Sequence, residues 1–434
     1  MSSFRNPKHV QRYEDISFDL NTPLVTVIAN GAYQKKDGYR FVADNSGEVA
    51  PFDWYNARFE VDFDVKLVAD GGNIADNTDA SGMVNGAHSL IKKIIVKVNG
   101  VPVYECGNAN HCVNIKNLLE YNRSYAMSIG TNQFYYLDTT GSAEERTAAA
   151  QAATYNRGFA ARKLELGLSQ TVNTEIPLNR YSFFESLQDE LIPNTKVEIE
   201  VELDSDANVV WRSALAASAD CRVVISKFRL WVPRIIFTPE GESLYMSKYL
   251  KPHKWTYLKE MVLSSNSTQQ KTGTFKISSG VNRPRHVFVW ISNDAFQDVQ
   301  TRNPFLYNTL SVANDRSLSS CQLEIGNGNY YPETIYQPNT EMSRIYRDVS
   351  KYVHGVNDYN GGTLLSRPNF ESLYSFIYFN LENQKADLKD GTTKLNFKYQ
   401  LSNNTATNYT VYALVLHEQD MEILLSSGKV MLRA

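Results

Sequence analysis

The chain has 434 residues, more than a single hydrophobic core usually supports, so two domains are expected. Its formal net charge of -3 argues against a chain that binds nucleic acid mainly through a large basic excess. The 26 tyrosines and 20 phenylalanines, together with many β-branched residues, favour strands over helices.

The cysteines and the apolar runs bear on where the chain is made. Four cysteines, Cys106, Cys112, Cys221 and Cys321, are too few and too scattered for a disulfide scaffold, which predicts a reducing compartment. The N-terminal segment MSSFRNPKHVQRYED contains no apolar stretch, so we expect no secretory signal. We also expect no membrane span, because no apolar run approaches the ~20 residues that crossing a bilayer requires.

Residues 1–20 are polar and include Arg5, Lys8 and Arg12. This composition predicts an N-terminal arm that becomes ordered only against a partner. Such an arm offers a weak contact to a genome, but a plain solvated tail explains three positive charges equally well.

Residues 56–68, NARFEVDFDVKLV, show the clearest alternation in the chain. Phe59, Val61 and Phe63 point to one side and Glu60 and Asp62 to the other, which predicts a strand with one buried face in an antiparallel sheet. Other strands of the first half are expected at residues 24–29, 90–98, 101–104, 163–168, 196–203 and 222–232. Three prolines mark a joint between the halves at residues 233–252.

Turn and helix signals separate these strands. Asn99-Gly100 predicts a tight hairpin, because both residues accept the positive φ of a type I′ turn. Residues 113–121 have helical spacing, residues 181–191 predict a turn followed by a helix, and the Ala-rich excursion at 141–157 begins with a capping box. Strands of the second half are expected at residues 254–263, 272–278, 286–291, 322–325, 375–381, 394–402 and 409–416.

The two halves repeat the same landmarks in the same order. The hairpin at Asn99-Gly100 has a counterpart at Asn327-Gly328, and a helical stretch follows each one. Further pairs are residues 181–183 with 374–376, 197–203 with 395–401, and 223–228 with 410–415. About eight strands per half with long loops predict an all-β chain of two related jelly rolls rather than immunoglobulin-type sandwiches.

A search for reactive chemistry gives no positive result. The segment Cys106 to Cys112, with His111, is the best metal candidate, but a structural zinc site needs four ligands and no second pair stands at the required spacing. Met421 replaces the second histidine of an HExxH motif, and Val209 replaces the glycine of a calcium loop. No nucleotide-binding loop or nucleophile elbow is present in the sequence, so we predict no catalytic, cofactor or metal site, although residues that only the fold brings together remain open.

The segment at residues 286–312 is the most distinctive in the chain. An apolar strand runs into Asn293-Asp294-Ala295-Phe296 and then into Arg302-Asn303-Pro304-Phe305, where a second strand is expected. This pair of turns resembles the second-domain motif of the major capsid proteins of Polinton/Maverick elements, adintoviruses and Polinton-like viruses. Looser similarities lie in the hairpin after residues 88–90, in residues 118–121 and in the last two strands, so that the resemblance covers roughly residues 55–425.

The resemblance implies two vertical eight-stranded jelly rolls in one chain, at residues 21–238 and 239–434, after an arm at residues 1–20. It implies a homotrimer that forms a pseudo-hexagonal capsomer and tiles an icosahedral shell, in contact with neighbouring capsomers and with penton and minor capsid proteins of a virion. It implies no enzyme and no cofactor. We expect the side chains that shape or pin the two turns to be Asn293, Asp294, Phe296, Asn303, Pro304 and Phe305. The alternatives are a jelly-roll carbohydrate-binding protein, because Tyr and Trp can stack on sugars, and an enzyme on a double β-sandwich.

Overall fold

The fold is seen in a computed structural model. The residues that it describes are 5–18, 22–24, 38–45, 50–67, 72–74, 82–83, 85–139, 157–192, 195–211, 221–249, 252–296, 300, 303–307, 309–311, 316–326, 328–352, 363–382, 392–403, 405, 407–424 and 429–433.

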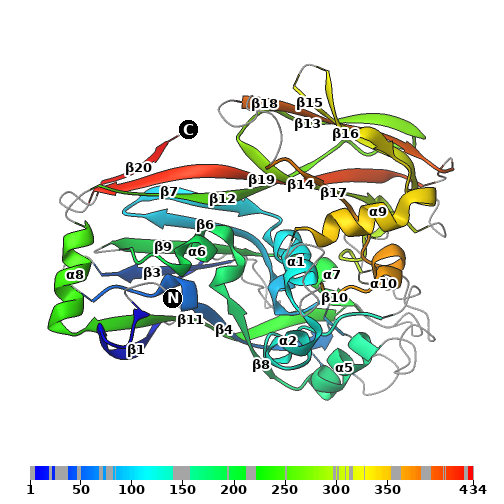
Figure 1. The fold of residues 1–434 in the computed structure, drawn as a ribbon. Coiled ribbons are helices and arrows are strands. Elements are labelled where there is room, and N and C mark those ends of the chain that lie inside the picture. The colour runs from blue at the N-terminus through cyan, green and yellow to red at the C-terminus, as the bar shows by residue number, and fades with distance from the viewer. Residues whose placement is uncertain are drawn as a thin grey trace.

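The first half of the chain forms two facing sheets (Figure 1). One sheet has the order β1 (Val10–Phe18), β11 (Cys221–Phe237), β4 (Arg58–Leu67) and β8 (Val172–Pro177). The other has the order β2 (Thr22–Leu24), β3 (Gly38–Asp44), β9 (Lys196–Leu203), β6 (Ile91–Val98) and β7 (Val101–Gly107). The alternation predicted for β4 is observed, and Phe59 on β4 meets Phe41 on β3 with ring centroids 5.4 Å apart.

The second half is built in the same way. One sheet has the order β12 (His253–Ser264), β19 (Tyr409–Leu424), β14 (Pro284–Asn293) and β17 (Ile377–Asn380), with β20 (Lys429–Arg433) also paired to β19. The facing sheet has the order β13 (Thr272–Asn282), β18 (Thr392–Leu401), β15 (Leu318–Ile325) and β16 (Asn329–Tyr336). A small extra sheet in the first half pairs β5 (Gly82–Met83) with β10 (Val210–Trp211).

The two halves share one topology. If the eight long strands of each half are numbered in chain order, one sheet contains the first, eighth, third and sixth, and the other contains the second, seventh, fourth and fifth. This is the arrangement of a jelly roll, in which two Greek keys fold over each other. The predicted all-β fold class of two eight-stranded jelly rolls is therefore confirmed.

Short helices occupy the connections. Their bounds are α1 (Ala109–Glu120), α2 (Arg123–Met127), α3 (Ile129–Asn132), α5 (Arg157–Leu166), α6 (Ser182–Glu185), α7 (Asp206–Val209), α8 (Pro239–Tyr249), α9 (Pro338–Ser350) and α10 (Arg367–Ser372). Helix α8 links the two jelly rolls, at the opposite end of the molecule from α9 and α10 (Figure 1). Among the described residues, no helix has the length and apolar character needed to cross a membrane.

Most of the repeated landmarks are structurally equivalent. Both hairpins join the fourth strand to the fifth, and α1 and α9 follow them as expected. Strand β9 corresponds to β18, and β11 to β19. One correspondence is wrong: residues 181–183 follow the sixth strand of the first half, whereas residues 374–376 precede the sixth strand of the second. Both segments bury aromatic rings beside that strand, which explains the similar short sequences.

The predicted N-terminal arm is wrong for the described residues 5–18. Strand β1 pairs with β11 from Val10 opposite Phe237 to Phe18 opposite Leu230, and it supplies the first strand of the first jelly roll. Ile16 and Phe18 pack against the core while the intervening polar residues face outward. Because only one face of this edge strand is buried, its sequence has the polarity of a tail.

Several local predictions also fail. Residues 163–168 belong mainly to helix α5 rather than to a strand, because Phe159, Arg162 and Leu166 are buried at helical spacing. No strand follows Phe305 within the described residues 303–307 and 309–311. Pro233 lies inside β11, so the joint begins later than expected. The helix predicted at residues 141–157 falls almost entirely outside the described residues.

Candidate functional site

The two jelly rolls meet along a seam that begins with two adjacent strands. Strand β12 of the second half packs beside β7 of the first, and the Tyr257 hydroxyl on β12 donates a hydrogen bond to the Val103 carbonyl on β7. Further along the seam, residues from the long connections of both halves come together. These connections carry the turns that the sequence singled out, so the seam is the candidate functional site.

Asn303 lies at the centre of this meeting point. Its side chain is fully buried, and its Nδ2 donates to Asp138 Oδ2 at 3.0 Å and to Asn85 Oδ1 at 3.4 Å, both in the first half. Its own Oδ1 accepts the backbone N–H of Phe305 at 2.9 Å, which shapes the turn around the buried Pro304. One asparagine therefore both closes its turn and joins the two jelly rolls.

Phe305 extends the same contact with an aromatic ring. It is 1% exposed, and its ring centroid lies 4.6 Å from that of His111 on α1 and 6.4 Å from that of His88. The His111 ring also stacks on Trp290 of β14 at 5.7 Å. Burial lowers the pKa of His111 to about 4 and that of His88 to about 3, so both imidazoles are neutral at pH 7.

Asp138 is a common acceptor for groups from both halves. Arg162 on α5 donates to its Oδ1 at 2.7 Å, and both side chains are fully buried. The hydroxyl of Tyr374, from the second half, donates to the Asp138 carbonyl oxygen at 3.2 Å. The carboxylate, which accepts from Arg162 and Asn303, and the backbone carbonyl, which accepts from Tyr374, together fix the relative position of the connections around Asp138.

The first turn of the motif behaves differently. Asn293 Oδ1 accepts the backbone N–H of Ala295 at 3.0 Å, and Asp294 Oδ1 accepts the hydroxyl of Thr410 at 2.7 Å. The Ser267 hydroxyl donates to the other Asp294 oxygen. All of these partners belong to the second jelly roll, so this turn is tied to its own domain. The side chain of Phe296 lies outside what the structure describes.

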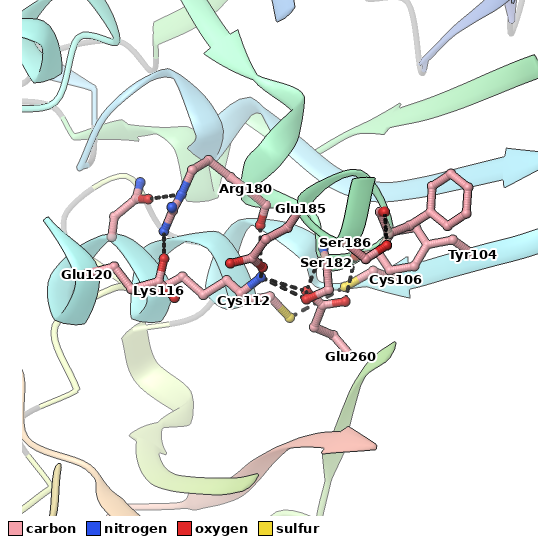
Figure 2. Close-up of polar contacts among 12 residues, drawn as sticks. Tyr104, Cys106, Cys112, Lys116, Glu120, Arg180, Ser182, Glu185, Ser186 and Glu260 are labelled. Atoms are coloured by element: carbon pink, nitrogen blue, oxygen red, sulfur yellow. Dashed lines mark hydrogen bonds and ion pairs between the residues drawn. The ribbon is translucent and has the colours of Figure 1, made fainter. Parts of the chain in front are cut away.

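A second polar cluster crosses the seam at β12 (Figure 2). Glu260 on β12 is 2% exposed and reaches into the first half, where it accepts the hydroxyl of Tyr104 at 2.7 Å and the backbone N–H of Ser182 at 3.1 Å. Lys116 on α1 donates to Glu260 at 3.3 Å and to Glu185 at 2.7 Å. The second half thus inserts one carboxylate into a socket of donors from the first.

Electrostatics keep this cluster charged. Burial alone would lower the pKa of Lys116, but the carboxylates of Glu185 and Glu260 outweigh it and raise that pKa above its ordinary value. Burial raises the pKa of Tyr104 well above its ordinary value, and the Glu260 carboxylate adds to the shift. The lysine is an ammonium donor and the tyrosine a neutral donor, which is the combination that a buried carboxylate requires.

The cluster also resembles a serine–lysine dyad, because Lys116 Nζ lies 2.8 Å from Ser182 Oγ. A general base must be able to lose its proton near neutral pH, and the raised pKa of Lys116 opposes that. The space beside Lys116, Glu260 and Tyr352 leaves no room for a water-sized molecule. The arrangement therefore suits docking of the two halves and not turnover of a substrate.

The predicted metal candidate does not assemble as a ligand set. Cys106 Sγ and Cys112 Sγ lie 3.4 Å apart, but the ring of His111 is directed to Trp290 and Phe305. Across the described residues, no group of three or more His, Cys, Asp and Glu side chains is arranged to hold a metal ion.

Sequence reasoning found Asn303 and Phe305 but missed Lys116, Asp138, Arg162 and Glu260. One signal was available for Lys116, which stands among buried apolar residues of α1, four residues after Cys112 and three before Leu119. A lysine in that position needs a buried partner. The identity of that partner was not accessible, since Glu260 is 144 residues away.

Comparisons with known proteins bear on the fold. No protein-family model matches the sequence, and no curated protein sequence matches it. Among solved structures, the Sputnik virophage structure is similar over 98% of this chain and 89% of that one, with a TM-score of 0.62 and 12% identity. The Faustovirus major capsid protein is similar over 97% and 92%, with a TM-score of 0.58 and 9% identity. The PBCV-1 virus capsid is similar over 98% and 97%, with a TM-score of 0.55 and 12% identity. At these identities the likeness shows a shared double jelly-roll fold.

Proposed function

We propose that this chain is a viral major capsid protein that builds an icosahedral shell. The observation that carries the proposal is the repeated jelly roll together with a likeness that extends over nearly the whole chain to structures from viral capsids. Three copies of a chain with two similar domains present six similar units, so a closed threefold assembly can pack like a hexagon. The chain would act as a homotrimer, and its place would be the virion.

The narrower assignment is to the capsid proteins of Polinton/Maverick elements, adintoviruses and Polinton-like viruses. Its support is the order of two motifs in this sequence, Asn293-Asp294-Ala295-Phe296 followed by Asn303-Pro304-Phe305. The second motif makes contacts across the seam between the jelly rolls, so it contributes to the docking of the two domains in a double jelly roll. Neighbouring capsomers, penton proteins and minor capsid proteins are the partners that this assignment entails.

We assign structural roles to the six motif residues. Asn293 and Asp294 hold the first turn to the second jelly roll, and Asn303, Pro304 and Phe305 dock the second turn onto the first jelly roll. Phe296 is proposed to anchor the first turn. The proposed boundary between the jelly rolls lies near residues 238–239, where β11 ends and α8 begins. The first jelly roll includes β1, and Arg5 is bound to Asp53, so the arm proposed at residues 1–20 is not kept for residues 5–18.

Two N-terminal arginines differ in what they could offer to a genome. Arg5 donates to Asp53 through two contacts, at 2.6 and 3.1 Å, and Arg12 lies 2.6 Å from Glu14. The charge of Arg5 is thus compensated within the chain, whereas the exposed Arg12 shares Glu14 with Arg234, so the weak genome contact stays a proposal for Arg12 alone.

Mass in solution tests the proposal against the carbohydrate-binding alternative. The purified chain is analysed by sedimentation velocity over a range of concentrations, and the same sample is applied to a glycan array. We expect a stable trimer, with larger shells at high concentration and no selective glycan binding. A strict monomer that binds glycans would overturn the capsid assignment in favour of a lectin-like jelly roll.

A further inference from the structure

Two cysteines of the first jelly roll lie in contact beside the seam. Cys106 is on β7 and Cys112 is in the first turns of α1, and both side chains are buried. Their Sγ atoms are 3.4 Å apart (Figure 2). Only residues 107–111 separate them, and Asn108, with a φ of 52°, turns the chain so that α1 starts next to the end of β7.

The geometry favours a bond between these two sulfurs. A disulfide has an S–S length of about 2.05 Å, so the sulfurs need to approach by roughly 1.3 Å. Both cysteines are held by regular secondary structure on either side of a short connection, so the two sulfurs stay close without a large change in backbone conformation. The other two cysteines lie apart from this pair, with Cys221 on β11 and Cys321 on β15.

We propose that Cys106 and Cys112 form an oxidisable pair that a peroxide converts into an intramolecular disulfide within the folded chain. In the first step, the thiolate of one cysteine attacks the peroxide O–O bond and becomes a sulfenic acid, and the departing hydroxide takes up a proton to give water. In the second step, the other sulfur attacks the sulfenic sulfur, the S–S bond forms, the S–O bond breaks and a second water leaves. The two sulfurs lose two electrons in total, and the peroxide is reduced to two waters.

The surroundings predict a slow reaction that depends on pH. Because both thiols are buried and the space beside Cys112 holds no water-sized molecule, a peroxide reaches them only when the native chain opens locally. Burial raises the pKa of the Cys112 thiol well above its ordinary value, and the adjacent Cys106 adds to the shift. Because the thiolate is the reactive form, the rate should rise with pH and should remain below that of an exposed cysteine. A chain made in a reducing compartment would therefore carry two thiols, and prolonged contact with an oxidant would close the bond.

The disulfide would join the two elements that hold Glu260. Strand β7 carries Tyr104 and helix α1 carries Lys116, and both side chains bind that carboxylate. A covalent link between β7 and α1 reduces the conformational freedom of the unfolded chain. In the folded chain it holds the two elements that bind Glu260 together. Oxidation should therefore raise the Tm of the chain by about 2 °C.

Mass spectrometry of the full-length native chain tests the proposal. The protein is incubated with hydrogen peroxide at pH 7 and at pH 9, quenched, alkylated in denaturant and digested with trypsin. Residues 98–116 form one tryptic peptide that contains both cysteines, because Lys97 and Lys116 are the flanking cleavage sites. We expect this peptide to become lighter by two hydrogen atoms and resistant to alkylation, faster at pH 9, while Cys221 and Cys321 remain alkylatable.

The variants Cys106→Ser and Cys112→Ser provide the matched controls, and each should lose the oxidised peptide and the gain in Tm. The wild-type measurement stands by itself if either variant fails to fold. Oxidation of all four cysteines at equal rates would overturn the proposal. A 98–116 peptide that stays fully alkylatable in the native chain, or closes only after denaturation, would overturn it as well.

Discussion

Two asparagines make the same local turn and have different consequences. Asn293 and Asn303 each accept the backbone N–H of the residue two positions on, at 3.0 and 2.9 Å. The turn at Asn293 is surrounded by Ser267 and Thr410 of its own jelly roll, whereas the turn at Asn303 reaches Asn85 and Asp138 of the other. Similar turn chemistry therefore serves one domain in the first case and the union of two domains in the second.

This difference indicates which substitutions should lower the stability of the chain most. A turn that packs within one jelly roll is supported by the sheet on which it lies. A turn that crosses the seam affects both domains when it is lost, because neither half completes that part of its core alone. Substitutions across the seam should therefore cost more than matched substitutions inside one half.

The largest effect is expected at Phe305. Phe305→Ala should lower the free energy of unfolding by about 4 kcal/mol, because it removes a buried ring from the contact with His111 and leaves a cavity at the seam. Urea unfolding followed by tryptophan fluorescence measures the change. Phe305→Leu keeps most of the volume and should lose less than about 1.5 kcal/mol. Equal stability of the Ala variant and the wild type would show that the ring does not join the halves.

The ionic contact at β12 should give the next largest effect. Glu260→Ala leaves Lys116 buried without one of its two carboxylates, and a loss of about 3 kcal/mol is expected. The double variant Lys116→Met with Glu260→Leu removes both charges and should recover most of that loss. Calorimetric unfolding of the two proteins provides the measurement. A double variant that is as unstable as the single one would mean that the charges matter less than packing.

Asn303→Ala and Asn293→Ala test whether the turn at the seam contributes more stability than the turn within one jelly roll. The Asn303 variant leaves buried Asp138 with one donor fewer, so a loss of about 2 kcal/mol is expected. The Asn293 variant loses a turn hydrogen bond only within one half and should cost about 1 kcal/mol. Both values come from the same denaturation series. The comparison fails if the two substitutions cost the same.

Acid should weaken the seam through its buried histidines. Burial lowers the pKa of His111 from an ordinary value of 6.5 to about 4. Between pH 6.5 and pH 4, His111 is therefore protonated in the unfolded chain and neutral in the folded chain. The contribution of His111 to the free energy of unfolding is fully present above pH 6.5. It decreases as the pH falls toward 4, with a slope of about 1.4 kcal/mol per pH unit. His111→Phe should flatten the stability profile in this window. An unchanged slope in the variant would contradict the assignment.

The smallest effect is expected at the first turn. Asp294→Ala removes hydrogen bonds from Thr410 and Ser267, on a side chain that is not fully buried, and should cost less than about 1 kcal/mol. Thermal unfolding measures this cost. The folded variant should keep the oligomeric state of the wild type. A loss as large as that of Asn303→Ala would place the first turn at an interface.

Much of the fold followed from local sequence patterns. Strand β9 was predicted with its observed bounds, because its alternation of charged and β-branched residues needs one buried face. The hairpin at Asn99-Gly100 was predicted because both residues adopt positive φ, and they do so at 50° and 81°. Strand β1 was missed because it is a polar edge strand. The end of α5 was taken for a strand because residues 163–168 alternate between apolar leucines and other residues.

The seam was predictable only in part. The sequence drew attention to Asn303 and Phe305 because they stand in a distinctive motif. It gave no indication of Asn85 and Asp138, which lie 218 and 165 residues away and become neighbours only when both jelly rolls have formed. Turn chemistry is local and can be read from a few residues, whereas the pairing of two domains depends on contacts between distant parts of the chain.

An image of the purified protein is the strongest test of the capsid assignment. Single-particle electron microscopy of the chain in solution should show a threefold particle in which six jelly rolls form a pseudo-hexagonal base, two from each chain. A monomeric particle at all concentrations, or an assembly without threefold symmetry, would contradict the proposal that this double jelly roll builds a capsid.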